Sequence, residues 1–218
     1  MIAIWFVDID IVQEMQIMTR QQDREKHENY IIEEFVKSHN KSFGTRFWLP
    51  RDHSPTESPD RYYLKNGKKG WIETTDIYHD KSEAEYLWKS IDQDPSTKPF
   101  IVCEPNLISD CICNDCFKKV CKPSYEKLSQ DYGPGTLVLS VESRLFTKAD
   151  LEKLKSNMLD IYRLAKNDFF CPTFFGEVFL RFRFSECSHR FIKIFPQWGQ
   201  EFPSFVRDEQ VISTSIFT

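Results

Sequence analysis

Residues 58–79 have the sequence SPDRYYLKNGKKGWIETTDIYH, which predicts a β-hairpin. The Asn66-Gly67 pair stands between two β-prone runs, and this dipeptide is the strongest short-range signal for a two-residue hairpin turn. Asp60 enters the first strand and Glu73 lies inside the second, so antiparallel pairing places both acids at one end of the ribbon. Two carboxylates held that close repel each other unless a cation lies between them, and Mg²⁺ suits such an oxygen pair. The alternative is a solvated hairpin whose acids face water.

Length and composition indicate one globular domain over residues 1–218, because 40% of the residues are hydrophobic and 28% are charged. The formal net charge is -4, so any contact with nucleic acid needs a local basic patch. The lysines at the hairpin tip either form a solvated turn or meet a phosphate backbone. These are Lys65, Lys68 and Lys69.

The N-terminus and the cysteines bear on the location of the protein. No apolar run is long enough to span a bilayer. Residues 1–7 are apolar but lack a basic leader, and Asp8 and Asp10 follow, so a strand is predicted there rather than a secretion signal. We therefore expect a cytoplasmic protein with no membrane partner, in which the cysteines are thiols or metal ligands rather than disulfides.

Hydrophobic periodicity predicts a mixed α/β fold in which helices flank a sheet. A helix over residues 20–38 carries an apolar stripe with Glu34 on or beside it. Residues 136–141 form a continuous apolar run, typical of a strand covered on both faces. The segment from Thr147 to Asp150 resembles a capping box, which opens an amphipathic helix to about residue 166. The remaining predictions are strands near 43–49, 100–103, 178–184 and 191–195 and helices at 82–91 and 124–132.

The hairpin and the elements around it resemble the PD-(D/E)xK nuclease superfamily, which has the restriction-endonuclease-like fold. The core of that family runs helix, three antiparallel strands, helix, strand, and here it would cover about residues 20–142. The matching motif is Pro59-Asp60 followed by Glu73-Thr74-Thr75. The resemblance implies that Asp60 and Glu73 hold Mg²⁺ or Mn²⁺. It also implies that an acid on the first helix joins the site, and Glu34 matches that acid, with Glu33 as its rival.

One position departs from the family motif. The family has a lysine two residues after the glutamate, where it helps to activate the attacking water, and this chain has Thr75 there. Threonine cannot supply a positive charge. Three explanations are open: Lys127 supplies the charge from elsewhere, or Thr75 orients the water with His79 of the same strand face as the base, or the site is inactive.

Four cysteines are crowded into eleven residues, within a stretch at 103–123 that we predict to be a Cys-rich insertion. Tight thiol spacing in an intracellular protein suggests Zn²⁺ coordination, or less favourably an iron–sulfur cluster. A bound zinc ion would fold a segment that has no core of its own. The alternative is a set of reduced thiols in a loop. The candidate ligands are Cys111, Cys113, Cys116 and Cys121, with Cys103 as the first substitute.

Three functions are consistent with these features. The first is a Mg²⁺-dependent nuclease that hydrolyses phosphodiester bonds in nucleic acid. The second is an inactive module of the same fold that binds nucleic acid or a protein. The third is a zinc-stabilised adaptor with an unrelated α/β fold. The separation of the Asp60 and Glu73 carboxylates distinguishes the third function from the others, because the nuclease-like fold brings these two groups together.

Overall fold

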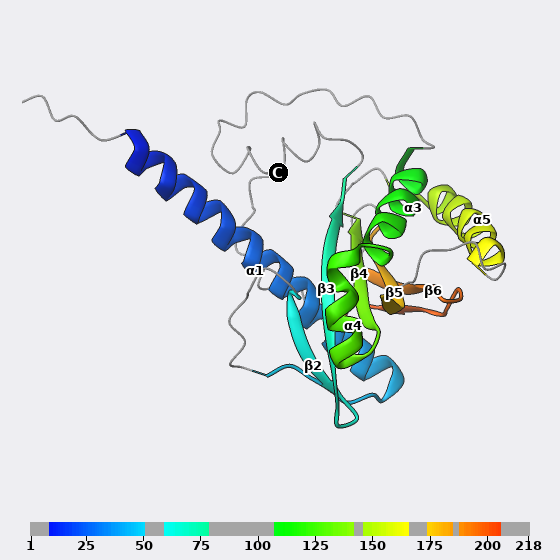
Figure 1. Cartoon of the computed structure of the whole chain (residues 1–218). Coiled ribbons are helices and arrows are strands. Elements are labelled where there is room, and N and C mark those ends of the chain that lie inside the picture. The colour runs from blue at the N-terminus through cyan, green and yellow to red at the C-terminus, as the bar shows by residue number, and fades with distance from the viewer. Residues whose placement is uncertain are drawn as a thin grey trace, which may run out of the picture.

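The computed structural model describes residues 9–50, 59–78, 107–141, 146–165, 174–184 and 188–205, and only the backbone at 9–21 and 159–165. These residues form an α/β fold around one seven-stranded mixed sheet, whose strands lie side by side in chain order (Figure 1). The strands are β1 (Phe47–Trp48), β2 (Arg61–Lys65), β3 (Lys68–Ile77), β4 (Gly135–Val141), β5 (Phe175–Phe182), β6 (Arg190–Phe195) and β7 (Glu201–Pro203). The helices are α1 (Ile9–Phe43), α3 (Leu107–Val120), the 3-10 helix η1 (Pro123–Tyr125), α4 (Glu126–Tyr132) and α5 (Lys148–Ala165).

The sheet is parallel in its middle and antiparallel at both ends. Strands β1, β2 and β3 pair antiparallel, β4 pairs parallel with β3, and β5 pairs parallel with β4. Strands β6 and β7 return antiparallel. The parallel step from β3 to β4 needs a long crossover, and α3, η1 and α4 lie within it. Strand β4 is buried at every residue, which confirms the prediction of a strand covered on both faces.

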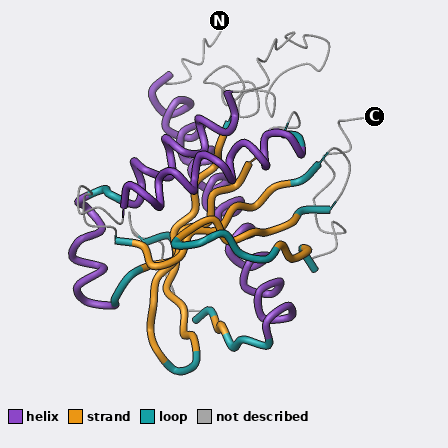
Figure 2. The backbone as a smooth tube through the Cα atoms, turned by 90° about the vertical axis from the view of Figure 1, so that its right-hand side faces the viewer, coloured by secondary structure: helices purple, strands orange, loops and turns teal. Residues whose placement is uncertain are grey.

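The predicted hairpin is confirmed, and its turn has the expected chemistry. Asn66 and Gly67 both have positive φ angles, 52° and 79°, as a type I′ turn requires. The ladder begins with Lys65 opposite Lys68 and ends with Arg61 opposite Ile72. The turn projects at the bottom of Figure 1 and again in the orthogonal view of Figure 2. The two arms therefore lead from the tip directly to residues 60 and 73.

Helices cover both faces of the sheet. On one face α1 contributes Phe35 to an apolar cluster with Val138 of β4. On the other face α3 and α5 contribute Ile112 and Leu154 to a second cluster with Leu139 of β4. Because consecutive strand residues point to opposite faces, these two clusters are separated by the sheet. We call them the α1 face and the α3 face.

Helix α5 begins at the predicted capping box. The Thr147 N–H donates to Asp150 Oδ2 at 2.8 Å, and the Asp150 N–H donates to Thr147 Oγ1 at 3.3 Å. This reciprocal pairing satisfies two backbone donors of the first turn. The helix itself runs over Lys148–Ala165, so the prediction for this segment is confirmed.

Helix α1 and its surroundings differ from the prediction in their limits. The helix extends the predicted range 20–38 at both ends and continues to Phe43, where Gly44 follows with a φ of 62°. Because the helix occupies the start of the range 43–49, the strand predicted there is reduced to β1. The predicted strands at 1–7 and 100–103 and the predicted helix at 82–91 lie outside the described residues.

The part of the Cys-rich segment that the structure describes, residues 107–123, is mainly helical. Helix α3 buries Ile108, Ile112, Cys116 and Val120 against the α3 face of the sheet, and their spacing of four places them on one side of a helix. The sheet thus supplies the apolar contacts that this segment lacks by itself. None of the described helices is both long and apolar enough to cross a membrane.

Candidate active site

The hairpin brings Asp60 and Glu73 together. The ladder ends with Arg61 opposite Ile72, so Asp60 comes to lie beside Glu73 one step further along. The Asp60 N–H donates to Glu73 Oε2 at 3.3 Å. Asp60 Oδ2 accepts hydrogen bonds from the Thr74 N–H at 2.6 Å and the Thr74 hydroxyl at 2.7 Å. Local backbone contacts therefore hold both carboxyl groups at one end of the ribbon.

The electrostatics of this pair disfavour two negative charges. Burial and, to a smaller extent, the nearby carboxylates of Glu73 and Glu28 raise the pKa of Asp60 to about 7, against the lowering effect of the two Thr74 hydrogen bonds. A carboxyl group with that pKa holds its proton in much of the population at neutral pH. A cation bound between the acids would remove this penalty.

Two side chains from the crossover contact Glu73. The Tyr125 hydroxyl donates to Glu73 Oε1 at 2.6 Å, and Lys119 Nζ donates to the same oxygen at 3.3 Å. Lys119 comes from the last turn of α3 and Tyr125 from η1, and Tyr125 stacks on the buried Trp71 of β3 at 5.4 Å between ring centroids. Burial and the charge of Glu73 raise the pKa of Tyr125, so its hydroxyl keeps the proton that it donates.

Among the described residues, neither Thr75 nor Lys127 makes a side-chain hydrogen bond or ion pair to Asp60 or Glu73. The Thr75 hydroxyl donates to the carbonyl of Thr74 at 2.7 Å. Lys127 is exposed on α4, and no hydrogen bond or ion pair among the described residues joins it to Asp60 or Glu73. The cation beside Glu73 is Lys119, which sequence reasoning missed because 46 residues separate the two positions. His79 lies outside the described residues.

The two acids predicted from α1 lie away from this pair. Glu34 is 1% exposed on the α1 face and accepts from Arg181 Nε of β5 at 2.7 Å. Glu33 is exposed and pairs with Lys37 at 3.4 Å. The acid of α1 that acts on Asp60 is Glu28, which raises its pKa. Six residues, or less than two helical turns, separate Glu28 from Glu34, and periodicity alone does not show where along its length a helix crosses the hairpin.

Asp60 and Glu73 fit a hard divalent cation by their chemistry. Mg²⁺ binds through one or two carboxylates and keeps several water molecules, and both hydrogen bonds from Thr74 go to Oδ2 of Asp60. Within the described ranges, no group of three or more Asp, Glu, His or Cys side chains could hold a metal ion. The pair would therefore supply two ligands, and water or substrate oxygens would supply the rest.

The four clustered cysteines are thiols rather than disulfides and lie on or just after α3: Cys111, Cys113, Cys116 and Cys121. Burial, with smaller effects of Cys113 and Cys121, raises the pKa of Cys116 to about 12. Burial also raises the pKa of Cys113 to about 11, with Asp110 adding to it. Zinc binds thiolates, and within the described residues no three Cys, His, Asp or Glu side chains come together in a way that could hold a metal ion. Zinc binding at these positions stays a prediction, and Cys103 lies outside the described residues.

Comparisons with known proteins identify no relative. No protein-family model, no curated protein and no solved structure matches this chain.

Proposed function

We propose that this protein is a metal-dependent nuclease of the PD-(D/E)xK type, which hydrolyses phosphodiester bonds in nucleic acid. The observation that carries the proposal is the convergence of Asp60 and Glu73 at the end of one hairpin, with Lys119 against Glu73. The order of elements supports it. Helix α1, the antiparallel strands β1 to β3, the helices of the crossover and β4 follow the order of that nuclease core.

Asp60 and Glu73 would hold Mg²⁺ or Mn²⁺. A bound ion of this kind would polarise the phosphate and lower the pKa of a water molecule beside it. Thr74 fixes the Asp60 carboxylate through its N–H and its hydroxyl, and Tyr125 fixes Glu73. Both acids are therefore held in place before substrate arrives, which reduces the reorganisation that the reaction needs.

Lys119 replaces the lysine that the motif lacks at position 75. Its side chain is one quarter exposed and its Nζ lies 3.3 Å from Glu73 Oε1, so the ammonium group could contact an anionic phosphate bound beside the acids. A positive charge stabilises a developing negative charge by its position in space, whichever element of the fold carries it. We assign Lys119, rather than Lys127, to the stabilisation of charge on the phosphate.

The test is cleavage by Asp60→Ala and Glu73→Ala. Each variant is expected to lose Mg²⁺-dependent cleavage of DNA and RNA while keeping the far-ultraviolet circular dichroism spectrum of the parent. Glu33→Ala is the matched control, because Glu33 is an exposed acid remote from the pair, and it should cleave like the parent. Parental activity in both Asp60→Ala and Glu73→Ala would overturn the proposal.

A second function is an inactive module that binds nucleic acid. The observation that favours it is the saturation of Glu73 Oε1, which already accepts from Tyr125 and Lys119, and the absence of a lysine at position 75. Calorimetric titration with Mg²⁺ separates the two functions. The nuclease binds Mg²⁺ and loses that binding in Asp60→Asn, whereas the inactive module gives the same isotherm for parent and variant.

A further inference from the structure

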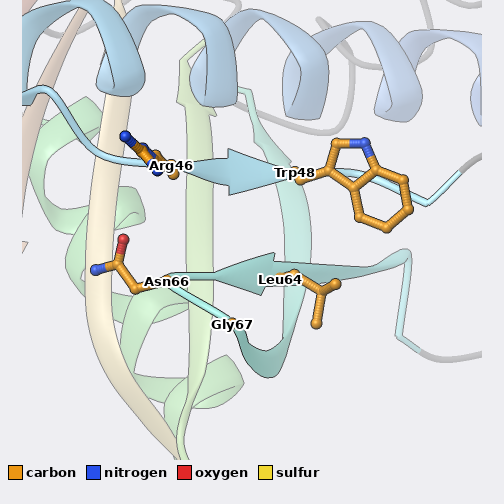
Figure 3. A pocket seen from close by; sticks show the side chains of 5 residues that line it. All are labelled: Arg46, Trp48, Leu64, Asn66 and Gly67. Atoms are coloured by element: carbon orange, nitrogen blue, oxygen red, sulfur yellow. The ribbon is translucent and has the colours of Figure 1, made fainter.

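A shallow groove lies near the outer edge of the sheet, across the paired strands β1 and β2 and the hairpin turn. It encloses about 600 Å³ and is lined by Arg46, Trp48, Leu64, Asn66 and Gly67. Figure 3 shows Trp48 and Leu64 at one end of the groove and Arg46 and Asn66 at the other. The groove is thus apolar at one end and polar at the other.

The apolar end presents an unusually exposed indole. Trp48 is 57% exposed, more than the other exposed large apolar side chains of the described residues, Phe43, Phe117 and Phe205. Trp48 and Leu64 are cross-strand partners, so they stand on the same face of the sheet. Contiguous apolar surface left open to water commonly marks a binding site, and here Trp48 and Leu64 together form such a surface at one end of the groove.

The surroundings of the groove carry positive charge. Arg46 is exposed and has no ion pair among the described residues. The exposed Lys69 lies 4.5 Å from the ring centroids of both Tyr62 and Tyr132, and Lys68 is exposed beside the turn. Cations interleaved with aromatic rings are the surface that single-stranded nucleic acids use, because bases stack on the rings while phosphates meet the cations.

The backbone edge next to the groove is blocked against an added peptide strand. The Asn40 side chain donates to the Phe47 carbonyl at 2.8 Å and accepts from the Phe47 N–H at 2.8 Å. Both outward polar groups of that strand residue are therefore satisfied, and strand addition, which needs free backbone groups at a sheet edge, is disfavoured there. Side chains, not backbone, make the recognition surface.

The groove and the paired acids lie on the same hairpin and are oriented to one sheet face. Leu64 pairs with Lys69, and Lys69, Trp71 and Glu73 alternate along β3 toward the α3 face. Four residues separate Lys69 from Glu73, which is about 13 Å along a strand. Both features therefore belong to one sheet face, and Trp71, which lies between them, is buried under Tyr125.

We infer that this groove binds an unpaired base of single-stranded nucleic acid, stacked on Trp48, with Arg46 and the hairpin lysines on the adjacent phosphates. The inference deepens the proposed function, because it names single strands as the substrate class. A base inside a duplex is stacked on both faces and offers no free surface to the indole.

The experiment measures binding without cleavage. A fluorescein-labelled single strand of about 12 nucleotides, within the site sizes that such grooves cover, is titrated with the full-length protein in EDTA and followed by fluorescence anisotropy. Trp48→Ala is expected to weaken binding roughly 5- to 100-fold, the range for loss of one stacked base. Trp48→Phe keeps an aromatic ring and should retain most of the affinity. Phe205→Ala removes an exposed ring outside the groove and should bind like the parent.

The same oligonucleotide annealed to its complement provides the second arm. Weaker binding of the duplex, without any effect of Trp48→Ala on it, supports the inference. Equal affinity of Trp48→Ala and the parent for the single strand overturns it, as does an equal loss for single strand and duplex. Failure of the proposed function is separate: Asp60→Ala then leaves cleavage unchanged, whatever Trp48→Ala does to binding.

Discussion

Two buried glutamates lie on opposite faces of one sheet, and their charge environments differ. Glu34 is fully enclosed, and its charge is matched by Arg181, which also donates to Ser140 Oγ at 2.8 Å. Glu73 shares its surroundings with Asp60 and has Lys119 as its cation. The first acid is balanced by protein charges. The second belongs to a pair that one lysine does not balance.

This difference separates a structural ion pair from a site that can take a ligand. A buried carboxylate with a well-placed guanidinium has no use for a further cation. Two carboxylates with one partly exposed lysine retain negative charge, and the pKa of Asp60 rises to about 7 in response, mainly through burial. Negative charge that Lys119 only partly compensates, at a position that is not fully enclosed, favours a metal ion at Asp60 and Glu73 rather than at Glu34.

The largest effect is expected at the buried ion pair between Glu34 and Arg181. Arg181→Met leaves Glu34 buried without its partner and should lower the free energy of unfolding by about 3–5 kcal/mol, measured by urea denaturation. The double variant Arg181→Met/Glu34→Gln, which removes both charges, should recover most of the loss. A single variant as stable as the parent would show that Glu34 is not held by Arg181.

Removal of Lys119, the cation beside Asp60 and Glu73, is expected to affect catalysis rather than folding. Lys119→Met should lower kcat for nucleic-acid cleavage by roughly 10²- to 10³-fold, the usual effect of losing one group that stabilises transition-state charge. Lys127→Met is the matched control and should leave kcat unchanged, because Lys127 is exposed and away from the acids. The reverse ranking of the two variants would return the role to Lys127.

Asp60→Asn should stabilise the protein at high pH. The folded-state pKa of Asp60 is about 7 against an ordinary value of 3.8, so ionisation costs the folded state more than the unfolded state. The cost is absent below pH about 4, grows as pH rises, and is complete above pH about 7. The variant should therefore gain on the order of 2–4 kcal/mol at pH about 8 and nothing at pH about 4, in urea titrations with EDTA. A gain that is independent of pH contradicts this account of the site.

The smallest effect is expected at the motif position itself. Thr75→Val removes a hydroxyl that donates to the carbonyl of its own neighbour, and a neutral hydrogen bond of this kind contributes only about 0.5–1.5 kcal/mol. Cleavage should change by less than about 10-fold, measured as kcat/KM beside the parent. A loss as large as that of Lys119→Met would instead assign the positioning of water to Thr75.

Several parts of the fold could be predicted because their cause is local. Asn66-Gly67 adopts positive φ angles that few other residues tolerate, which sets the hairpin and with it the approach of Asp60 to Glu73. Thr147 and Asp150 are three residues apart, which is the spacing of a capping box, so the sequence alone predicts their reciprocal hydrogen bonds. In each case the interacting groups are close neighbours in the chain or are joined by one tight turn.

The partners of the acids could not be predicted, because they depend on how distant elements pack. Lys119 meets Glu73 only because α3 lies on the face of the sheet toward which Glu73 points, and Glu28 approaches Asp60 only because α1 crosses the hairpin there. A helical pattern places Glu34 on or beside the apolar stripe of its helix, and it shows neither that Glu34 is buried nor that Arg181 lies opposite it. The chain encodes its turns and caps over a few residues, whereas the charge around each buried acid is a sum over side chains that come together in the folded sheet and its helices.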